Sequence, residues 1–283
     1  MNIPFTKMVG TGNDFILLDT RREALKTSHP NWTLAARAFC DRHTGIGADG
    51  ILVLGPSRSA DVRMRIFNAD GSEPEMCGNG ARCVALYESG QRGRRRVTIQ
   101  AQAGRLSANV QGDQVAIHLT DPTALQLDRT VTVGERRIRL GVVNTGVPHA
   151  VVPVSSVERV DVDGLGRTLR RHRAFGPRGT NVNFIQSRGR RLRIRTYERG
   201  VEAETLACGT GMTAAAIVHG VQRARGSKGR VRVQVEPKSG DRLSVSFAVS
   251  GRNGHQRVTD VVLTGPARRV FDGAVTWPRQ GRR

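Results

Sequence analysis

Hydrophobic and polar residues alternate in short runs along most of this chain, which is the period of strands that bury one face. Val62, Met64 and Ile66, for example, alternate with Arg63 and Arg65. Similar runs bounded by Gly, Pro or Asp predict strands throughout the sequence. The expected strands are 3–8, 15–19, 51–54, 61–67, 96–100, 105–110 and 114–119, followed by 131–133, 137–143, 181–185, 192–197, 231–235, 242–249 and 258–263.

Two longer segments have the composition of helices, at 81–88 and 212–225. The second contains Ala214-Ala215-Ala216-Ile217-Val218, which is apolar on every side and therefore predicts a buried helix. A sheet curved around each helix would bury it. Two further helices are expected, at 34–41 with Thr33 as N-cap and at 155–172 with a break near Gly164-Leu165-Gly166.

Each of the two long helices follows a cysteine and a glycine-rich turn. Cys77-Gly78-Asn79-Gly80 precedes the first helix, and Cys208-Gly209-Thr210-Gly211 precedes the second. Glycine lets the backbone turn tightly and point its N–H groups at an anion, and the helix dipole favours ionisation of a thiol there. Two such thiols facing one substrate could remove a proton from one side and return it on the other.

A wider internal repeat supports this pairing. Thr11-Gly12 lies 66 residues ahead of Cys77, and Thr145-Gly146 lies 63 residues ahead of Cys208. We interpret this as duplication of one structural unit. The polar run from Asp121-Pro122 to 129 marks the boundary, so the expected division is 1–125, 126–273 and a basic tail at 274–283, with a disordered end after Gly281.

Composition narrows the class of protein. The chain has 283 residues, 38% hydrophobic and only 4% aromatic, which suits two domains with aliphatic cores. No apolar run is long enough to span a membrane, and the N-terminus lacks the features of a signal peptide. Cys40 and Cys83 lie in helix-like apolar patterns and are expected in the core, and the four cysteines have no zinc-like spacing. We therefore expect a cytoplasmic protein without a metal.

The net charge of +21 raises a second possibility, a protein that binds nucleic acid or another polyanion. Arginines cluster at 92–96, 167–173, 188–195 and 279–283. No nucleic-acid-binding motif accompanies them, and aromatic residues for base stacking are scarce. We therefore do not expect specific nucleic-acid binding, although weak retention at low salt is compatible with the charge.

Taken together, these motifs resemble those of the diaminopimelate epimerase family of cofactor-independent amino-acid racemases. The resemblance extends from residue 5 to about 273. The two Cys-Gly loops alone would also fit relatives of proline racemase. Matching segments are 5–8, 12–15, 42–50, 67–72, 77–83, Gly146 with Pro148-His149, 197–200 and 208–211.

The resemblance implies an α+β fold of two pseudo-symmetric domains, each a curved, mainly antiparallel sheet wrapped around a central helix, with the site in the cleft between them. It implies a homodimer that interconverts LL- and meso-2,6-diaminopimelate for lysine and peptidoglycan precursors, without a cofactor. Cys77 and Cys208 would be the acid/base pair. The implied substrate-binding residues are Asn13, Asn68, Asn181, Glu198 and Arg199, with Gly78, Asn79, Gly209 and Thr210 around the reacting carboxylate and with His149 and Glu198 flanking the reacting centre.

Plainer interpretations of these side chains stay open. Asn13 could be a turn residue, Asn68 and Asn181 could cap backbone groups, and His149 could belong to the core. Many relatives carry Asn where this chain has Val147, which removes an amide from the substrate shell. A racemase acting on another amino acid, such as histidine or proline, is the main alternative. A pyridoxal enzyme is not expected, because no lysine lies near either thiol loop.

Overall fold

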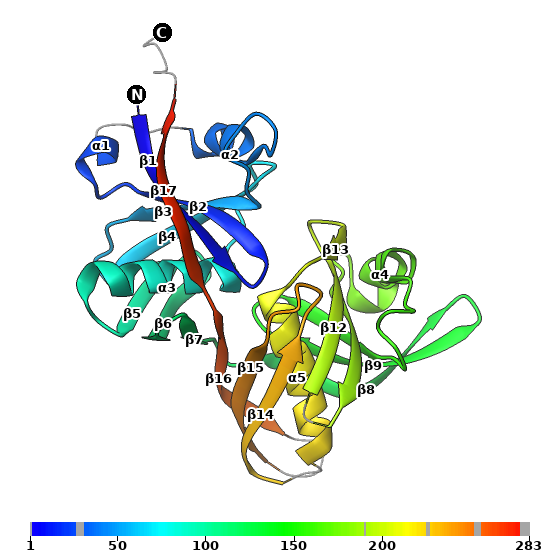
Figure 1. The fold of residues 1–283 in the computed structure, drawn as a ribbon. Helices are drawn as coiled ribbons and strands as arrows, with labels where there is room; N and C mark the ends of the chain where they lie inside the picture. The colour runs from blue at the N-terminus through cyan, green and yellow to red at the C-terminus, as the bar shows by residue number, and fades with distance from the viewer. Residues whose placement is uncertain (1, 27–30, 190, 225–226, 252–255, 278–283) are drawn as a thin grey trace. The chain divides into compact units, whose positions relative to one another are not determined.

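The computed structural model describes residues 2–26, 31–189, 191–224, 227–251 and 256–277. The chain divides into two compact units. The first unit combines residues up to Ile117 with those from Pro266 onward, and the second is His118–Gly265. The expected α+β class is confirmed, since strands are the predominant element and each unit has one long helix (Figure 1).

In the first unit, the sheet has a repeating order of antiparallel and parallel pairs. β1 pairs antiparallel with β2, β2 parallel with β3, β3 antiparallel with β4, β4 parallel with β5, and β5 antiparallel with β6. The strands are β1 (Asn2–Gly10), β2 (Asn13–Asp19), β3 (Gly50–Gly55), β4 (Val62–Asn68), β5 (Arg96–Ala101), β6 (Gly104–Gln111), β7 (Gln114–His118) and β17 (Arg268–Thr276), and the helices are α1 (Glu23–Lys26), α2 (Trp32–Cys40) and α3 (Gly78–Arg92).

The second unit repeats this order. β9 pairs antiparallel with β10, β10 parallel with β11, β11 antiparallel with β12, β12 parallel with β14, and β14 antiparallel with β15. The expected duplication is therefore confirmed at the level of strand pairing. The elements are β8 (Thr123–Val133), β9 (Arg136–Asn144), β10 (Pro148–Pro153), α4 (Val162–Arg170), the 3-10 turn η1 (Arg173–Phe175), β11 (Asn181–Arg188), β12 (Arg191–Glu198), β13 (Ala203–Thr205), α5 (Gly209–Ala224), β14 (Gly229–Glu236), β15 (Leu243–Ser250) and β16 (Arg257–Pro266).

The long helix of each unit packs against several of its strands. α5 contacts β9, β10, β11, β12, β14 and β15, and its segment Ala214 to Val218 is fully buried, as the apolar run predicted. Its core partners include Val143, Leu192 and Phe247. α3 contacts β1, β4, β5 and β6 in the first unit. Each helix is therefore held along its length by a sheet, which fixes the position of the residues at its first turn.

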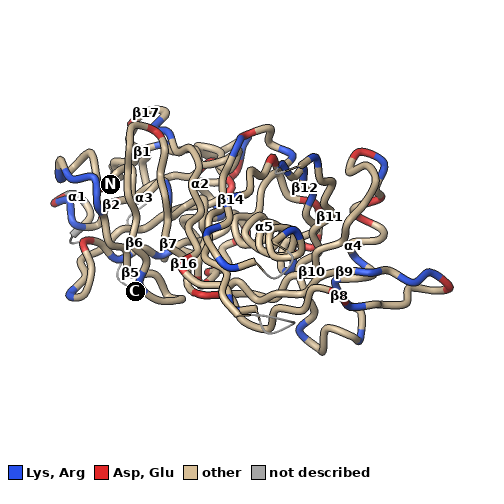
Figure 2. The backbone as a smooth tube through the Cα atoms, turned by 90° about the horizontal axis from the view of Figure 1, so that it is seen from below, with Lys and Arg blue, Asp and Glu red and all other residues tan. Residues whose placement is uncertain are grey.

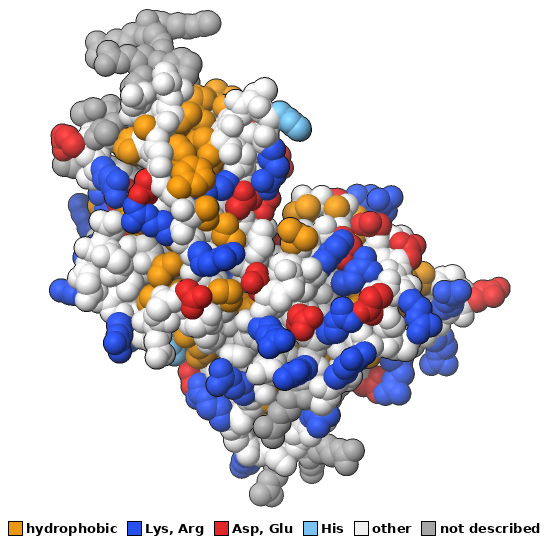
Figure 3. Space-filling view, in the orientation of Figure 1, with side chains coloured by type: hydrophobic (Ala, Val, Ile, Leu, Met, Phe, Trp, Pro, Cys, Tyr) orange, Lys and Arg blue, Asp and Glu red, His pale blue; other side chains and the backbone are white. Residues whose placement is uncertain are grey.

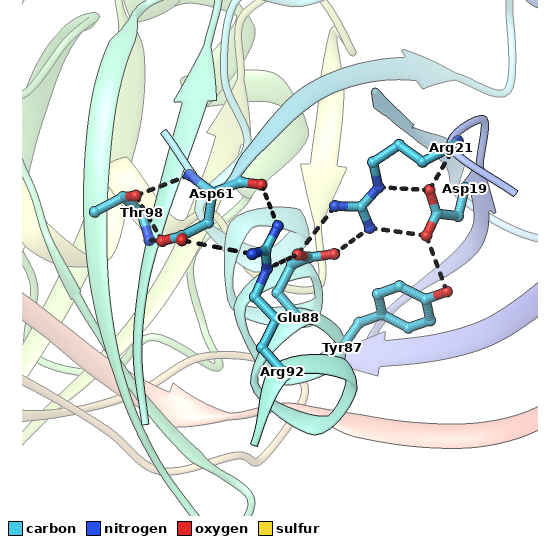
Figure 4. Close-up of polar contacts among 7 residues, drawn as sticks. All are labelled: Asp19, Arg21, Asp61, Tyr87, Glu88, Arg92 and Thr98. Atoms are coloured by element: carbon cyan, nitrogen blue, oxygen red, sulfur yellow. Dashed lines mark hydrogen bonds and ion pairs between the residues drawn. The ribbon is translucent and has the colours of Figure 1, made fainter. Parts of the chain in front are cut away.

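A buried carboxylate anchors the C-terminal part of α3 (Figure 4). Glu88 is fully buried, and both Arg21 and Arg92 donate to it. Arg21 also donates to Asp19 at 2.7 Å from Nε, and Arg92 donates to the carbonyl of Asp61 at 2.8 Å. These contacts connect the helix to the end of β2 and to the segment that precedes β4.

Several sequence predictions are wrong in detail. The helix expected at 155–172 begins only at Val162, where Asp161 caps it by accepting from Gly164 N at 2.9 Å. The glycines lie within this helix rather than at a break, because Gly166 lets it approach Tyr197, whose Cβ would be 2.6 Å from an added methyl group. The N-cap of α2 is Asn31, which accepts from Leu34 N at 3.2 Å, and not Thr33.

The expected domain division also needs correction. The polar run to 129 is no linker, since β8 already begins at Thr123. β17 pairs with β1 of the first unit, so residues from Pro266 onward do not belong with 126–265. The segment expected as a basic tail, 274–283, begins as a continuation of this strand to Thr276, and its residues 278–283 lie outside the described residues.

Candidate active site

In the first unit, Cys77 is the residue that caps α3. Its backbone is extended, with φ −140° and ψ 117°, and its Sγ accepts from Gly80 N at 3.4 Å. Gly78 and Asn79 form the first helical positions, so the helix begins three residues earlier than expected. A thiolate at this position would be stabilised by the backbone N–H groups and the dipole of the helix. The side chain is half-buried.

Two asparagines lie together beside this thiol loop. Asn79 donates from Nδ2 to Oδ1 of Asn13 at 2.5 Å, and Asn13 donates to Asp49 Oδ2 at 2.9 Å. Asn68 ends β4, donates to Ser72 Oγ at 3.0 Å and is followed by Ala69, whose N–H donates to Asp49 O at 3.2 Å. The fold thus brings all three predicted asparagines of this unit to the same end of the sheet.

Ion pairs that the sequence did not predict hold the loop that carries Asn13. Arg42 donates to both Asp14 and Asp49 at 2.8 Å, and Lys7 pairs with Asp14 at 2.8 Å. Burial alone would raise the pKa of Asp14, but hydrogen bonds from Arg42 and Lys7 hold it below its ordinary value. The Asp14 carboxylate therefore stays ionised, and its contacts with Lys7 and Arg42 fix the loop that carries Asn13.

In the second unit, Cys208 immediately precedes α5, and its carbonyl accepts from Met212 N at 2.9 Å. Its Sγ lies 3.4 Å from Thr210 Oγ1 and is hydrogen-bonded to the carboxyl group of Glu198. Burial raises the pKa of Glu198 above its ordinary value, although the nearby side chains of Thr205 and Cys208 oppose the shift. A carboxyl group and a thiol therefore share one site at the start of this helix.

His149 is fully buried on β10, and the positive charge of Arg199 acts on its ring. Burial and the positive charge of Arg199 lower the pKa of His149 to about 3, so the ring is neutral at neutral pH. Asn183 donates to Nδ1 at 3.2 Å, which makes Nε2 the protonated nitrogen. Among the described residues, nothing accepts a hydrogen bond from Nε2.

Asn181 uses both ends of its amide to hold the backbone. Its Oδ1 accepts from Arg199 N at 2.8 Å, and its Nδ2 donates to Pro148 O at 3.1 Å. The backbone-capping interpretation is therefore correct for Asn181 in this structure, and these contacts use one of the two N–H donors of the amide. Val147 also serves the backbone, since its carbonyl accepts from Thr145 N at 3.2 Å.

The buried cysteines differ from these two in environment. Cys40 and Cys83 lie in the core as expected, with 3% and 0% of their surface exposed. Burial raises the pKa of each to about 12. They would therefore be protonated and unreactive at neutral pH.

Asn183 is the main residue of this region that sequence reasoning missed. It is fully buried, holds the ring of His149, donates to Ala150 O at 3.0 Å and accepts from Thr196 Oγ1 at 3.1 Å. It stands two residues after Asn181, on the same face of β11, so strand periodicity could have identified it. The position of Asn183 also explains the glycine at 211, because an added methyl group there would lie 2.3 Å from Asn183 Oδ1.

The basic residues of the described chain are spread over many elements (Figure 2). Figure 2 shows lysine and arginine along both units, and on the face in Figure 3 they are interspersed with acidic side chains. One hollow of about 310 Å³ is lined by Arg188, Arg191, Arg193 and Arg242 but includes none of the predicted site residues. The described residues contain no group of His, Cys, Asp and Glu that could hold a metal ion. No helix among them is long and apolar enough to cross a membrane.

Solved structures share the fold. A phenazine biosynthesis protein of the PhzF family from Bacillus anthracis superposes with a TM-score of 0.71 at 16% identity, over 98% of this chain and 100% of the other. A hydroxyproline epimerase from Agrobacterium vitis, with bound trans-4-hydroxy-L-proline, gives 0.68 at 18% identity, over 97% and 91%. These likenesses establish the architecture.

Sequence comparison is more specific. The family model described as diaminopimelate epimerase matches residues 5–125 and 141–270. The diaminopimelate epimerase of Aquifex aeolicus is 41% identical, covering 96% of this chain and 97% of the relative. That of Archaeoglobus fulgidus is 40% identical, covering 96% of both. The chain therefore belongs to the diaminopimelate epimerase family.

Proposed function

We propose that this protein interconverts LL- and meso-2,6-diaminopimelate by moving the α-proton between Cys77 and Cys208, without a cofactor. The observation that carries the proposal is a thiol at the first turn of the long helix in each of two units with the same strand order. Membership of the diaminopimelate epimerase family supports the substrate.

Inversion requires two groups, because one base that returned its own proton would regenerate the starting isomer. One thiolate removes the α-proton, and the other, still protonated thiol delivers a proton to the opposite face; the roles exchange in the reverse direction. We assign Cys208 as acceptor and Cys77 as donor in one direction. The carbanion would be stabilised by N–H groups at Gly78-Asn79 and Gly209-Thr210 and by the two helix dipoles.

Two side chains of the second unit would support this chemistry. Glu198 has a raised pKa and a hydrogen bond to Cys208, so it can exchange a proton with that thiol. His149 is neutral, and its Nε2–H has no acceptor among the described residues, so it can donate to a substrate carboxylate. We propose both as supporting residues that flank the reacting carbon.

The remaining predicted residues would hold the substrate. Diaminopimelate carries an ammonium and a carboxylate group at each end, which require both acceptors and donors. Asn13, Asn68 and Asn181 supply amides, and Arg199 supplies a guanidinium for the distal carboxylate. Asn181 positions Arg199 directly, through the hydrogen bond to its backbone. Because Val147 has no amide, these four side chains would carry the recognition of the distal end.

The biological setting follows from this substrate. We propose a cytoplasmic enzyme that supplies lysine and peptidoglycan precursor biosynthesis. We also propose a homodimer, because β17 exposes apolar side chains, with Val270 at 55% and Phe271 at 47% of their surface. Exposed large apolar groups of this kind suit a subunit contact.

A test of substrate separates this function from racemisation of another amino acid. In deuterated water, LL-diaminopimelate should incorporate deuterium at the α-carbon far faster than lysine, because lysine leaves Arg199 without a distal carboxylate. Mass spectrometry and chiral chromatography follow exchange and inversion. If lysine, histidine or proline turned over as fast as diaminopimelate, the substrate assignment would be wrong.

A further inference from the structure

A fully buried arginine lies directly behind the first thiol loop. Arg82 is on α3, five residues after Cys77, and none of its surface is exposed. Its guanidinium donates to Asn79 Oδ1 at 2.7 Å and to the hydroxyl of Thr11. It also reaches the carbonyls of Gly78 at 3.5 Å and Pro266 at 3.4 Å. One rigid, planar group thus joins the thiol loop, the turn between β1 and β2, and the end of β16.

The contact with Thr11 holds an unfavourable backbone conformation. Thr11 has a φ of +54° and is 98% buried, with 2% of its surface exposed. A β-branched residue at positive φ is a genuine outlier, and such conformations persist only where surrounding contacts enforce them. Because this turn leads directly into Asn13, the guanidinium helps to set the backbone from which the Asn13 side chain projects.

The contact with Asn79 fixes the orientation of two side-chain amides, those of Asn79 and Asn13. Since Arg82 donates to Asn79 Oδ1, the Asn79 NH₂ group must face Asn13, to which it donates at 2.5 Å. Asn13 Oδ1 is then occupied, and its NH₂ group faces Asp49 at 2.9 Å. A guanidinium at one end and a carboxylate at the other therefore exclude the flipped orientation of both amides.

We propose that Arg82 is a positioning residue, which holds Asn79 and Asn13 in the one orientation that presents their N–H groups to the substrate carboxylate. This inference rests on the proposed function, because it takes both asparagines as substrate-binding groups. Arg82 itself does not touch the substrate; it acts through Asn79 and through the Thr11 turn.

The second unit shows why the first one needs this residue. Thr145, which corresponds to Thr11, donates directly to Thr210 O of its thiol loop at 3.1 Å. Thr213, which corresponds to Arg82, donates to Gly209 O within its own helix at 2.9 Å. The link between turn and thiol loop is direct there, and no pair of asparagines has to be oriented. The buried guanidinium therefore occurs in the unit that has the Asn79–Asn13 pair, and the other unit has a threonine at the corresponding position.

A double-mutant cycle between Arg82 and Asn79 tests the proposal. Arg82→Met should lower kcat/KM for LL-diaminopimelate about tenfold in the otherwise unchanged protein, but less than about threefold in the Asn79→Ala background. Arg82→Lys, which keeps the buried charge, should show the same pattern if the methionine variant does not fold. Glu88→Gln is the matched control, a buried ionic contact on the same helix, and its effect should be equal in both backgrounds.

A second readout does not depend on activity. In ¹H–¹⁵N spectra, the side-chain amide peaks of Asn13 and Asn79, assigned from Asn13→Ala and Asn79→Ala, should both shift in Arg82→Lys and stay in place in Glu88→Gln. Unmoved peaks, or an equal kinetic loss for Arg82→Met or Arg82→Lys in both backgrounds, would overturn the positioning role. If the wild-type protein left diaminopimelate unchanged, the proposed function would be refuted instead. The amide peaks would in that case still show whether Arg82 orients Asn79 and Asn13.

Discussion

Replacing Glu88 with glutamine should lower the free energy of unfolding of the first unit by about 2–3 kcal/mol. The Glu88 side chain is fully buried, and the substitution keeps its shape while removing its charge. Arg21 and Arg92 would then face a neutral amide that can accept through only one oxygen (Figure 4). The helix that carries Cys77 at its start would lose its main ionic contact with the surrounding chain.

The magnitude follows from how well the two arginines are solvated. Removing one partner of a fully buried ion pair costs about 3–5 kcal/mol. Here the side chain of Arg21 is 23% exposed and that of Arg92 is 39% exposed. Arg21 also keeps Asp19, and Arg92 keeps the carbonyl of Asp61. We therefore place the loss below the fully buried range.

Tryptophan fluorescence during urea unfolding isolates this effect. Both tryptophans of the chain, Trp32 and Trp277, belong to the first unit. The midpoint should fall while the dependence on urea concentration stays the same. Asp128→Asn, which breaks an exposed pair with Arg139, should leave the unfolding of its own unit unchanged by circular dichroism. A loss below about 1 kcal/mol for Glu88→Gln would refute the reasoning.

Two further predictions concern the second unit. The unfolded state binds a proton at His149 with a pKa of 6.5, whereas the folded state binds it only near 3, so stability falls as pH drops through that window. His149→Gln should therefore lose about 2 kcal/mol less than wild type between about pH 6.5 and 5, in urea unfolding followed by circular dichroism; equal losses would contradict a neutral buried ring. Gly211→Ala should destabilise strongly, because its methyl group would lie 2.3 Å from Asn183 Oδ1. Gly80→Ala, at the corresponding position of the first unit, meets only the flexible end of a leucine at 2.8 Å and should cost less in thermal unfolding; the reverse order would show that the contact with Asn183 can relax.

The sequence was informative where one pattern had one structural solution. A fully apolar run such as Ala214 to Val218 can only be buried, and the structure buries it completely. The two Cys-Gly turns likewise predicted a helix directly after each thiol, because glycine and a helical run favour the same local structure, although α3 and α5 each begin three residues earlier than expected. The family resemblance then supplied the remaining proposed site residues, which no local pattern could have singled out.

Tertiary contacts decided the features that the sequence did not reveal. Glycines usually end helices, but Gly166 is retained within α4 because Tyr197 packs against it. β17 lies beside β1, although nearly the whole chain separates them in sequence. The neutral state of His149 depends on its burial beside Arg199, and the orientation of Asn79 depends on a guanidinium behind it. None of these contacts has a signature in short-range periodicity.

Replacing the two proposed catalytic thiols one at a time tests the central claim most directly. Chiral chromatography would follow the conversion of LL- into meso-diaminopimelate by Cys77→Ala, Cys208→Ala and Cys40→Ala, the last as a control for a buried core thiol. Each of the first two variants should lose inversion by a factor of about 10² to 10⁴, the contribution typical of general acid–base catalysis. Cys40→Ala should retain most of its activity. Near-normal inversion by Cys77→Ala or Cys208→Ala would contradict the two-thiol mechanism.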